Sequence, residues 1–341
     1  MQLGTYIIRR LLLLIPVLIG VTIFVFALTR VTGDPIGAYI TPHMTPQDRE
    51  ILRHTLGFDQ PVFIQYFAWL KELLLNGNLG YSKVAELPVN EAIAKFFPAT
   101  IELTLWSMIF SIIFGISLGT VSAIKKDTMI DHVTRITSLA AVSIPVFWLG
   151  LLLLFVFYYQ LRWAPPPSGR LDENLFPISE IHLYTRIYLV DMLLNARLDY
   201  FWDALKHIIL PSITLAFATV ALIVRMMRAS MLEVLGSEYV RTARMKGASE
   251  KTVIRKHARR NALIPTTTVI GLSFGGLLTG AVLTESIFSW PGLGRWAASA
   301  LLANDQAAIV GFTLFTALIY VLANLIVDIL YSYLDPRVRL G

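Results

Sequence analysis

Hydrophobic residues in this chain are gathered into six long stretches that contain no Asp, Glu, Lys or Arg. The stretches are 18 to 26 residues long and run over 11–29, 103–124, 136–161, 207–224, 261–284 and 306–327. A helix needs about 20 apolar residues to cross the hydrocarbon core of a bilayer. The strands of an outer-membrane barrel are about 10 residues long and alternate in polarity, which these stretches do not. The pattern therefore predicts an all-α integral membrane protein with six transmembrane helices.

Composition supports this prediction. Of the 341 residues, 55% are hydrophobic and 15% are charged, whereas soluble domains have about 45–50% apolar and about 25% charged residues. An ordinary soluble enzyme and a disordered chain are both excluded. The chain has no cysteine, which excludes disulfides, thiol catalysis and cysteine-based metal sites.

Basic residues are distributed unevenly between the predicted spans. If the amino terminus is cytoplasmic, the inside segments carry a net charge of +10 and the outside segments −4; the inside segments are then 1–10, 125–135, 225–260 and 328–341. The positive-inside rule favours this orientation. We therefore expect a multi-pass protein of the cytoplasmic (inner) membrane with both termini cytoplasmic. Its net charge of +6 is explained by this placement, and no nucleic-acid partner is expected.

The amino-terminal stretch, residues 1–29, also looks like a cleavable signal peptide because Arg9 and Arg10 precede an apolar run. That run is 19 residues long, which exceeds the usual hydrophobic region of about 7–15 residues, and no A-x-A-like cleavage site follows it. We expect the stretch to be retained as the first span.

The chain divides into three expected parts. An amino-terminal tail with span one covers 1–30, an extracytoplasmic segment covers 31–102, and a membrane core with spans two to six covers 103–341. The core carries an extracytoplasmic insertion at 162–206 and a cytoplasmic loop at 233–262. Charges in the two external segments are expected to be mostly solvated.

Two helices are predicted in the first external segment. T-P-Q-D-R-E at 45–50 predicts a helix start with Thr45 as N-cap and Pro46 at the first helical position. The amphipathic, aromatic stretch 61–74 suits a helix that lies on the membrane surface.

Pairs of glycines four residues apart occur in two of the predicted spans. They are Gly115 with Gly119, Gly271 with Gly275, and Gly276 with Gly280. Such pairs let helix backbones approach closely, and we expect packing within this chain, with dimerisation as the alternative. G-L-S-F-G at 271–275 also matches the nucleophile motif of hydrolases, with Ser273 as the candidate. A strand-to-helix turn is not possible in mid-span, so close packing is favoured.

The informative loop is 225–260, which holds 10 Lys/Arg and only 3 acidic residues. The stretch 237–246 predicts a short helix capped by Ser237, and Gly247 suits a left-handed residue at its end. Ser249 can cap a second helix, and Pro265 marks the return to the membrane.

Small and basic side chains in this loop suggest a docking surface. Ala243 and Gly247 are spaced i, i+4 and form a small patch, and Tyr239, Arg244 and Lys246 flank it. A groove on another protein could receive such a patch. A basic loop held by anionic lipid headgroups is the open alternative.

The source of energy can be inferred from what the spans lack. No ionisable residue lies near the middle of any span, where ion-driven carriers commonly place one. The sequence contains no G-x-x-x-x-G-K-[ST] phosphate loop. A docking loop on a chain without a nucleotide site points to a separate ATPase subunit.

Four stretches, in order along the chain, carry a family resemblance. They are R-R-L-L-L-L-I-P-V-L-I-G-V-T-I-F-V-F-A-L with G-D-P at 33–35, E-Y-V-R-T-A-R-M-K-G-A-S at 238–249 with N-A-L-I-P at 261–265, E-S-I-F-S-W-P-G-L-G-R at 285–295, and D-I-L-Y-S-Y-L-D-P-R-V-R at 328–339. The chain resembles the B-type permease subunit of ATP-binding-cassette (ABC) importers of the dipeptide, oligopeptide and nickel class.

The resemblance implies a type I permease fold and a transport subunit that is not an enzyme. It implies a second homologous permease, two ATP-binding-cassette ATPase subunits and an extracytoplasmic solute-binding protein as partners. ATP and magnesium would be bound by the ATPase subunits, with no cofactor or metal in this chain. Peptides, oligosaccharides and nickel chelates are all possible solutes. A membrane scaffold or assembly protein without transport is the alternative.

The resemblance also assigns a coupling loop that docks into a cleft of the ATPase, the so-called EAA motif. Its residues are Glu238, Tyr239, Arg241, Ala243, Arg244, Gly247 and Pro265. Tyr239 and Val240 stand where the broader motif has two alanines. No residue is assigned to the substrate pathway.

Overall fold

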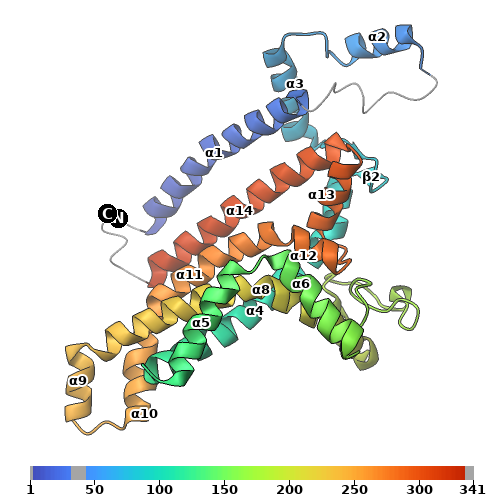
Figure 1. Ribbon diagram of the computed structural model, residues 1–341. Coiled ribbons are helices and arrows are strands. Elements are labelled where there is room, and N and C mark those ends of the chain that lie inside the picture. Colours follow the sequence, from blue (N-terminus) through green and yellow to red (C-terminus); the bar gives the residue numbers. More distant parts are fainter. Residues whose placement is uncertain (1–2, 32–43, 335–341) are drawn as a thin grey trace.

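The computed structural model describes residues 3–31 and 44–334, and most of this part of the chain is helical (Figure 1). The elements in the amino-terminal third are α1 (Leu3–Val31), α2 (Pro46–Thr55), α3 (Val62–Asn76), β1 (Tyr81–Ser82), β2 (Leu87–Pro88) and α4 (Val89–Ile124). The resemblance at 33–35, and the part of the carboxy-terminal match beyond 334, lie outside the described residues.

The middle of the chain contains the bent helices and the longest helix. Its elements are α5 (Met129–Ser143), α6 (Val146–Leu153), the π-helix η2 (Leu154–Gln160), the 3₁₀ turn η3 (Ile178–Glu180), α7 (Tyr188–Leu194) and α8 (Leu198–Leu235). The last part contains α9 (Glu238–Met245), α10 (Glu250–Thr252), the π-helix η4 (Val253–Ala258), α11 (Arg259–Gly280), α12 (Val282–Ile287), α13 (Leu293–Leu302) and α14 (Gln306–Leu334).

Within the described residues, four helical stretches are long and apolar enough to cross a membrane. They are Val89–Ile124, Leu198–Leu235, Glu250–Leu278 and Gln306–Val327. A fifth is possible in α5 and α6, whose axes differ by 108° because the helix breaks before Pro145. The apolar part of α1, Leu11–Ala27, is shorter. The architecture is that of a mostly helical membrane protein, with four or five such spans by this measure against the six predicted.

Two of the three predicted glycine pairs bring helices of this chain together, whereas a Cβ on Gly276 would meet nothing within 4 Å. A Cβ on Gly115 would lie 2.5 Å from Ile223 of α8, and one on Gly119 would lie 2.7 Å from Met227. Gly271 of α11 is equally close to Val327 of α14, at 2.7 Å. Only glycine permits these approaches, so α4 is held tightly against α8 and α11 against α14.

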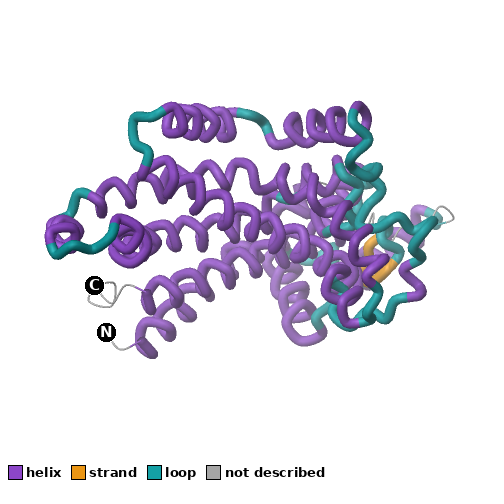
Figure 2. Tube along the Cα trace, turned by 90° about the horizontal axis from the view of Figure 1, so that it is seen from below, coloured by secondary structure: helices purple, strands orange, loops and turns teal. Residues whose placement is uncertain are grey.

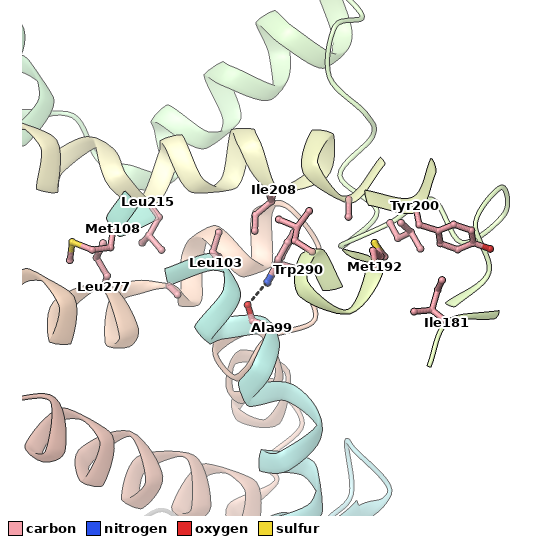
Figure 3. Packing of buried hydrophobic residues seen from close by; sticks show 14 residues of the cluster. Ala99, Leu103, Met108, Ile181, Met192, Tyr200, Ile208, Leu215, Leu277 and Trp290 are labelled. Atoms are coloured by element: carbon pink, nitrogen blue, oxygen red, sulfur yellow. Dashed lines mark hydrogen bonds between the residues drawn. The ribbon is translucent and has the colours of Figure 1, made fainter. Parts of the chain in front are cut away.

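The largest apolar cluster among the described residues includes Trp290, in the turn between α12 and α13 (Figure 3). The Trp290 indole donates a hydrogen bond of 2.8 Å to the carbonyl of Ala99 in α4. Leu103, Met192 and Ile208 are fully buried around it. Burial of each such side chain stabilises the fold by about 1.5–3 kcal/mol, so α4, α7, α8 and the α12–α13 turn form one core.

The 162–206 insertion is fastened to α4 by a buried ion pair between Arg170 and Glu102. Asp191, in α7, is also buried and accepts hydrogen bonds from the amide and hydroxyl of Thr185, both 2.8 Å long. The expectation of solvated external charges is wrong for Glu102, Arg170 and Asp191, because all three side chains are buried within the protein.

Glu285 organises the turn between α12 and α13. Its buried carboxylate accepts hydrogen bonds from the Thr100 hydroxyl (2.7 Å) and the Arg295 amide (2.9 Å). A Cβ on Gly292 would lie 2.3 Å from this carboxylate. The stretch E-S-I-F-S-W-P-G-L-G-R therefore forms a compact turn in which glycine makes room for a buried acid.

Helix α3 packs against α1 through aromatic side chains. The Tyr66 ring lies 5.4 Å from that of Phe26, and its hydroxyl hydrogen-bonds to Thr22 at 2.9 Å. On another face Phe63 and Phe67 are each 64% exposed. The amphipathic pattern is confirmed, and its placement on a membrane surface stays a prediction.

Candidate coupling site

The coupling loop (residues 233–262) lies at one end of the helical bundle. Figure 1 shows α9 and α10 at the end where α1 begins and α14 ends, away from α13 and β2. Figure 2 shows the two-stranded hairpin of β1 and β2 at the opposite end. The loop continues α8 directly: α8 ends at Leu235 and α9 begins at Glu238.

Helix α9 is anchored by one apolar side chain and one hydrogen bond. Val240 is completely buried, as is Val253 at the start of η4. The Asn261 side-chain amide donates to the Tyr239 hydroxyl at 2.7 Å and to the His257 carbonyl at 3.0 Å. These contacts hold α9 against the η4–α11 segment, so the loop is a folded unit.

The turn between α9 and α10 depends on Gly247. Its φ is +80°, as predicted for a left-handed residue, and its amide donates to the Arg244 carbonyl at 2.9 Å. Arg244 bridges the turn with two hydrogen bonds to Glu250, of 3.1 Å and 2.8 Å. The nearby Glu250 carboxylate raises the pKa of Arg244. The turn is thus set by one glycine and one ion pair.

Two local predictions need correction. Ser237 and Ser249 are at the N-cap positions, but their hydroxyls form no capping bond: Ser237 donates to the Val234 carbonyl and Ser249 pairs with Thr252. Ala243 and Gly247 do not share one helical face, because α9 ends at Met245 and the backbone reverses at Gly247. Pro265 lies within α11, and its place at the return to the membrane stays a prediction.

The outer surface of the loop is basic and open. The side chains of Glu238 and Arg241 are exposed, with 3.9 Å between the Glu238 carboxylate and the Arg241 guanidinium. Met245 is 74% exposed. The other exposed basic residues of this surface are Lys246, Lys251, Arg255, Lys256, Arg259 and Arg260. Such a surface suits a partner with an acidic rim and an apolar pocket.

A buried ion pair next to the loop was not predicted. Arg228, near the end of α8, donates two hydrogen bonds of 2.7 Å to Asp131 in the first turn of α5. Ser122 of α4 donates a third, of 2.6 Å. Helix α8 continues past Arg228 to Leu235, and the Arg228 side chain points to Asp131. In the sequence Asp131 lies in the predicted inside segment 125–135, before the span 136–161, and no periodicity links it to Arg228.

Candidate enzymatic sites are not supported. Ser273 lies inside α11, where its motif glycines contact α14: a Cβ on Gly275 would lie 3.4 Å from the Tyr320 ring. Among the described residues, no group of three or more His, Asp or Glu side chains could hold a metal ion.

Comparisons with known proteins cover nearly the whole chain. Residues 111–340 match the family described as binding-protein-dependent transport system inner membrane component, and residues 3–104 match the amino-terminal region of the same kind of membrane component. The dipeptide transport system permease protein DppB of Alkalihalophilus pseudofirmus is 44% identical over 335 residues, covering 98% of this chain and 99% of that protein.

Two further relatives are named for related solutes. The di/tripeptide transport system permease protein DppB of Pseudomonas aeruginosa is 44% identical, over 98% of both chains. The glutathione transport system permease protein GsiC of Escherichia coli is 36% identical, again over 98% of both chains.

Proposed function

The chain belongs to the family of binding-protein-dependent transport system inner membrane components, and from this we propose how it is placed in the membrane, which partners it binds and what it carries. It is a permease subunit of an ABC importer, a multi-pass membrane protein and a transport component rather than an enzyme. A non-transporting scaffold role is not supported, because relatives matched over nearly their full length are permeases.

Six spans are proposed, made by α1, α4, the bent pair α5–α6, α8, α11 and α14, with the coupling loop and both termini in the cytoplasm. Support comes from the loop's basic surface, since cytoplasmic segments carry an excess of Lys and Arg. The start of α1 and the end of α14 share its side of the bundle (Figure 1). The 31–102 segment and the 162–206 insertion then face the extracytoplasmic binding protein.

The proposed complex contains a second homologous permease, two ATPase subunits and a solute-binding protein. The coupling loop docks into a cleft of one ATPase through Glu238, Arg241 and the Gly247 turn. ATP and magnesium are bound by the ATPase subunits, so this chain needs no cofactor. The observation that carries this proposal is the α9–Gly247–α10 turn, folded and exposed at one end of the bundle.

Alternating access is the proposed mechanism. ATP binding brings the two ATPase domains together and moves both coupling loops, and the pathway between the two permeases opens outward, then inward. The binding protein delivers solute to the outward-open state. Energy for the change comes from the differing affinity of ATP and the binding protein for the two states.

The proposed solute is a short peptide. Relatives at 36–44% identity over nearly the full length are named for dipeptides, di- and tripeptides and glutathione. Oligosaccharides and nickel chelates are the less favoured solutes.

Co-purification tests the complex, and ligand identification tests the solute. A tagged chain expressed with its neighbouring transport genes should retain a second permease and two ATPase chains, and should hydrolyse ATP faster when the loaded binding protein is added. Mass spectrometry of that binding protein should detect peptides of a few residues. ATP hydrolysis or import by this chain alone would contradict the subunit assignment, and a bound sugar would contradict only the solute.

A further inference from the structure

We propose that the Arg228–Asp131 ion pair fastens α5 to α8, so that movement of the coupling loop is passed on to the bent pair α5–α6. The proposal rests on the proposed function, because it concerns how the docking of an ATPase reaches the membrane. Arg228 and Asp131 are positioning residues in this scheme and touch no solute.

The position of the pair suits this role. Arg228 lies two helical turns before the end of α8 at Leu235, and α8 passes into α9 through only two residues. Asp131 lies in the first turn of α5, next to the turn that joins α4 to α5. The pair therefore connects the helix that carries the coupling loop to the beginning of another helix.

The bonding at Asp131 is complete and specific. Its two carboxylate oxygens accept both Arg228 hydrogen bonds, the Ser122 hydroxyl and, at 3.1 Å, the Asp127 amide. The Asp131 side chain is fully buried and the Arg228 side chain is 20% exposed. Bidentate pairing between guanidinium and carboxylate fixes direction as well as distance, which is what a mechanical connection requires.

The rest of the buried face of α5 is built from small side chains. Its buried face also carries Thr134, Ser138 and Ala141, and the two hydroxyls donate to carbonyls of α5 itself. Among the described residues of α5, only Asp131 has a side chain that hydrogen-bonds to another element. Small side chains interlock weakly, so this face can slide once the ion pair is lost.

The outer face of α5 is exposed along the helix. Val133, Ile136 and Leu139 on its outer face are 53–66% exposed. At its far end the helix stops at Ser143, and Pro145 cannot continue its hydrogen bonding, so the chain bends by 108° into α6. Helix α5 thus has its ion pair at the end near the coupling loop and a sharp bend at the other end. Helix α4, by contrast, is packed along α8 by its glycines.

Transport per ATP in proteoliposomes containing the complete complex tests the proposal. In Arg228→Met, solute imported per ATP hydrolysed should fall by about fivefold or more, while the ATPase subunits stay bound. Arg228→Lys, which keeps the charge but loses the bidentate geometry, should give an intermediate ratio. The matched control is Arg225→Met: Arg225 is exposed on the same helix and forms no ion pair with a described residue.

A distance measurement separates coupling from a general loss of stability. Because the chain has no cysteine, spin labels can be placed at Met129→Cys in α5 and Thr242→Cys in α9. Their separation should stay the same between nucleotide-free and ATP-trapped complexes of the otherwise wild-type chain, and should change in Arg228→Met. If that variant does not fold, Asp131→Asn gives the same comparison.

The possible outcomes are distinct. An unchanged transport-to-ATP ratio in Arg228→Met, or labels that move apart equally in both proteins, overturns the fastening role. Failure of the unmutated chain to bind the ATPase overturns the proposed function itself.

Discussion

Glu102 and Arg170 are 68 residues apart in the sequence and form an ion pair inside the protein. The Arg170 guanidinium also donates to the Arg186 carbonyl at 2.9 Å and lies 3.4 Å from the centre of the Tyr188 ring. The other oxygen of Glu102 accepts the Leu189 amide at 2.9 Å. The 162–206 insertion is therefore attached to the amino-terminal half of α4 by a buried polar network.

Replacing Arg170 by Met should destabilise the protein strongly. Methionine retains apolar contacts but leaves the Glu102 carboxylate buried without its cation, a loss of about 3–5 kcal/mol. The midpoint of thermal unfolding of the purified protein should fall accordingly. Arg162→Met is the control, because Arg162 is exposed in the same insertion and should change stability by less than about 0.5 kcal/mol. Equal midpoints for the two variants would refute a structural role for the pair.

A methyl group at Gly292 should be poorly tolerated. The Gly292 backbone has φ −100°, which alanine adopts freely, so the cost is purely the clash with Glu285. Gly292→Ala should lower stability by about 1–3 kcal/mol. Gly276→Ala is the matched control, since a Cβ there meets nothing within 4 Å. Thermal unfolding of both variants tests this, and a neutral Gly292→Ala would show that the turn relaxes easily.

Local and periodic features could be predicted from the sequence. The apolar stretches correspond to helices, Gly115 and Gly119 pack within the chain, and Gly247 is left-handed, because each property depends on neighbouring residues or on one face of one helix. The bend at Pro145 could be predicted only in part. Proline indicates a break in a helix, but it does not give the angle of 108° between the segments before and after it.

The buried ion pairs and hydrogen bonds between distant residues could not be predicted in the same way. Arg228 and Asp131 are 97 residues apart, and Glu285 and Thr100 are 185 residues apart. No periodicity connects such positions, because their approach follows from how whole helices pack. The Ser237 cap failed for another reason: its hydroxyl can donate to the preceding turn as easily as it can accept from the next.

The start of α2 gives a prediction about pH. Asp48 accepts hydrogen bonds from the hydroxyl (2.7 Å) and the amide (2.9 Å) of Thr45, and these lower the pKa of Asp48 below the ordinary aspartate value. A lowered pKa means that the cap stabilises α2 at neutral pH and is lost only as the pH falls through that lowered value. The carboxyl carbon shift of Asp48 should report this titration by NMR.

Removing the Thr45 hydroxyl supplies the control for that titration. In Thr45→Ala the Asp48 pKa should move back toward the ordinary value, because its largest stabilising bond is gone. Thr55→Ala, which removes a hydroxyl that donates to the Ile51 carbonyl at the other end of α2, should leave the titration unchanged. Identical titration curves in both variants would contradict the capping assignment.

The turn at Gly247 should be essential for transport but not for membrane insertion. A Cβ there meets no atom within 4 Å, so substitution acts only through the backbone, whose φ of +80° costs an L-residue about 1–2 kcal/mol. Such a cost reduces the population of the native turn by about 5- to 30-fold. We expect the whole of this reduction in Gly247→Val, because valine is β-branched. Uptake by the reconstituted complex should therefore fall in Gly247→Val while membrane yield stays near normal.

Gly247→Asn should keep most of the uptake, because asparagine tolerates the left-handed region. A Gly247→Val complex that imports solute at the wild-type rate would show that this turn does not transmit the ATPase movement.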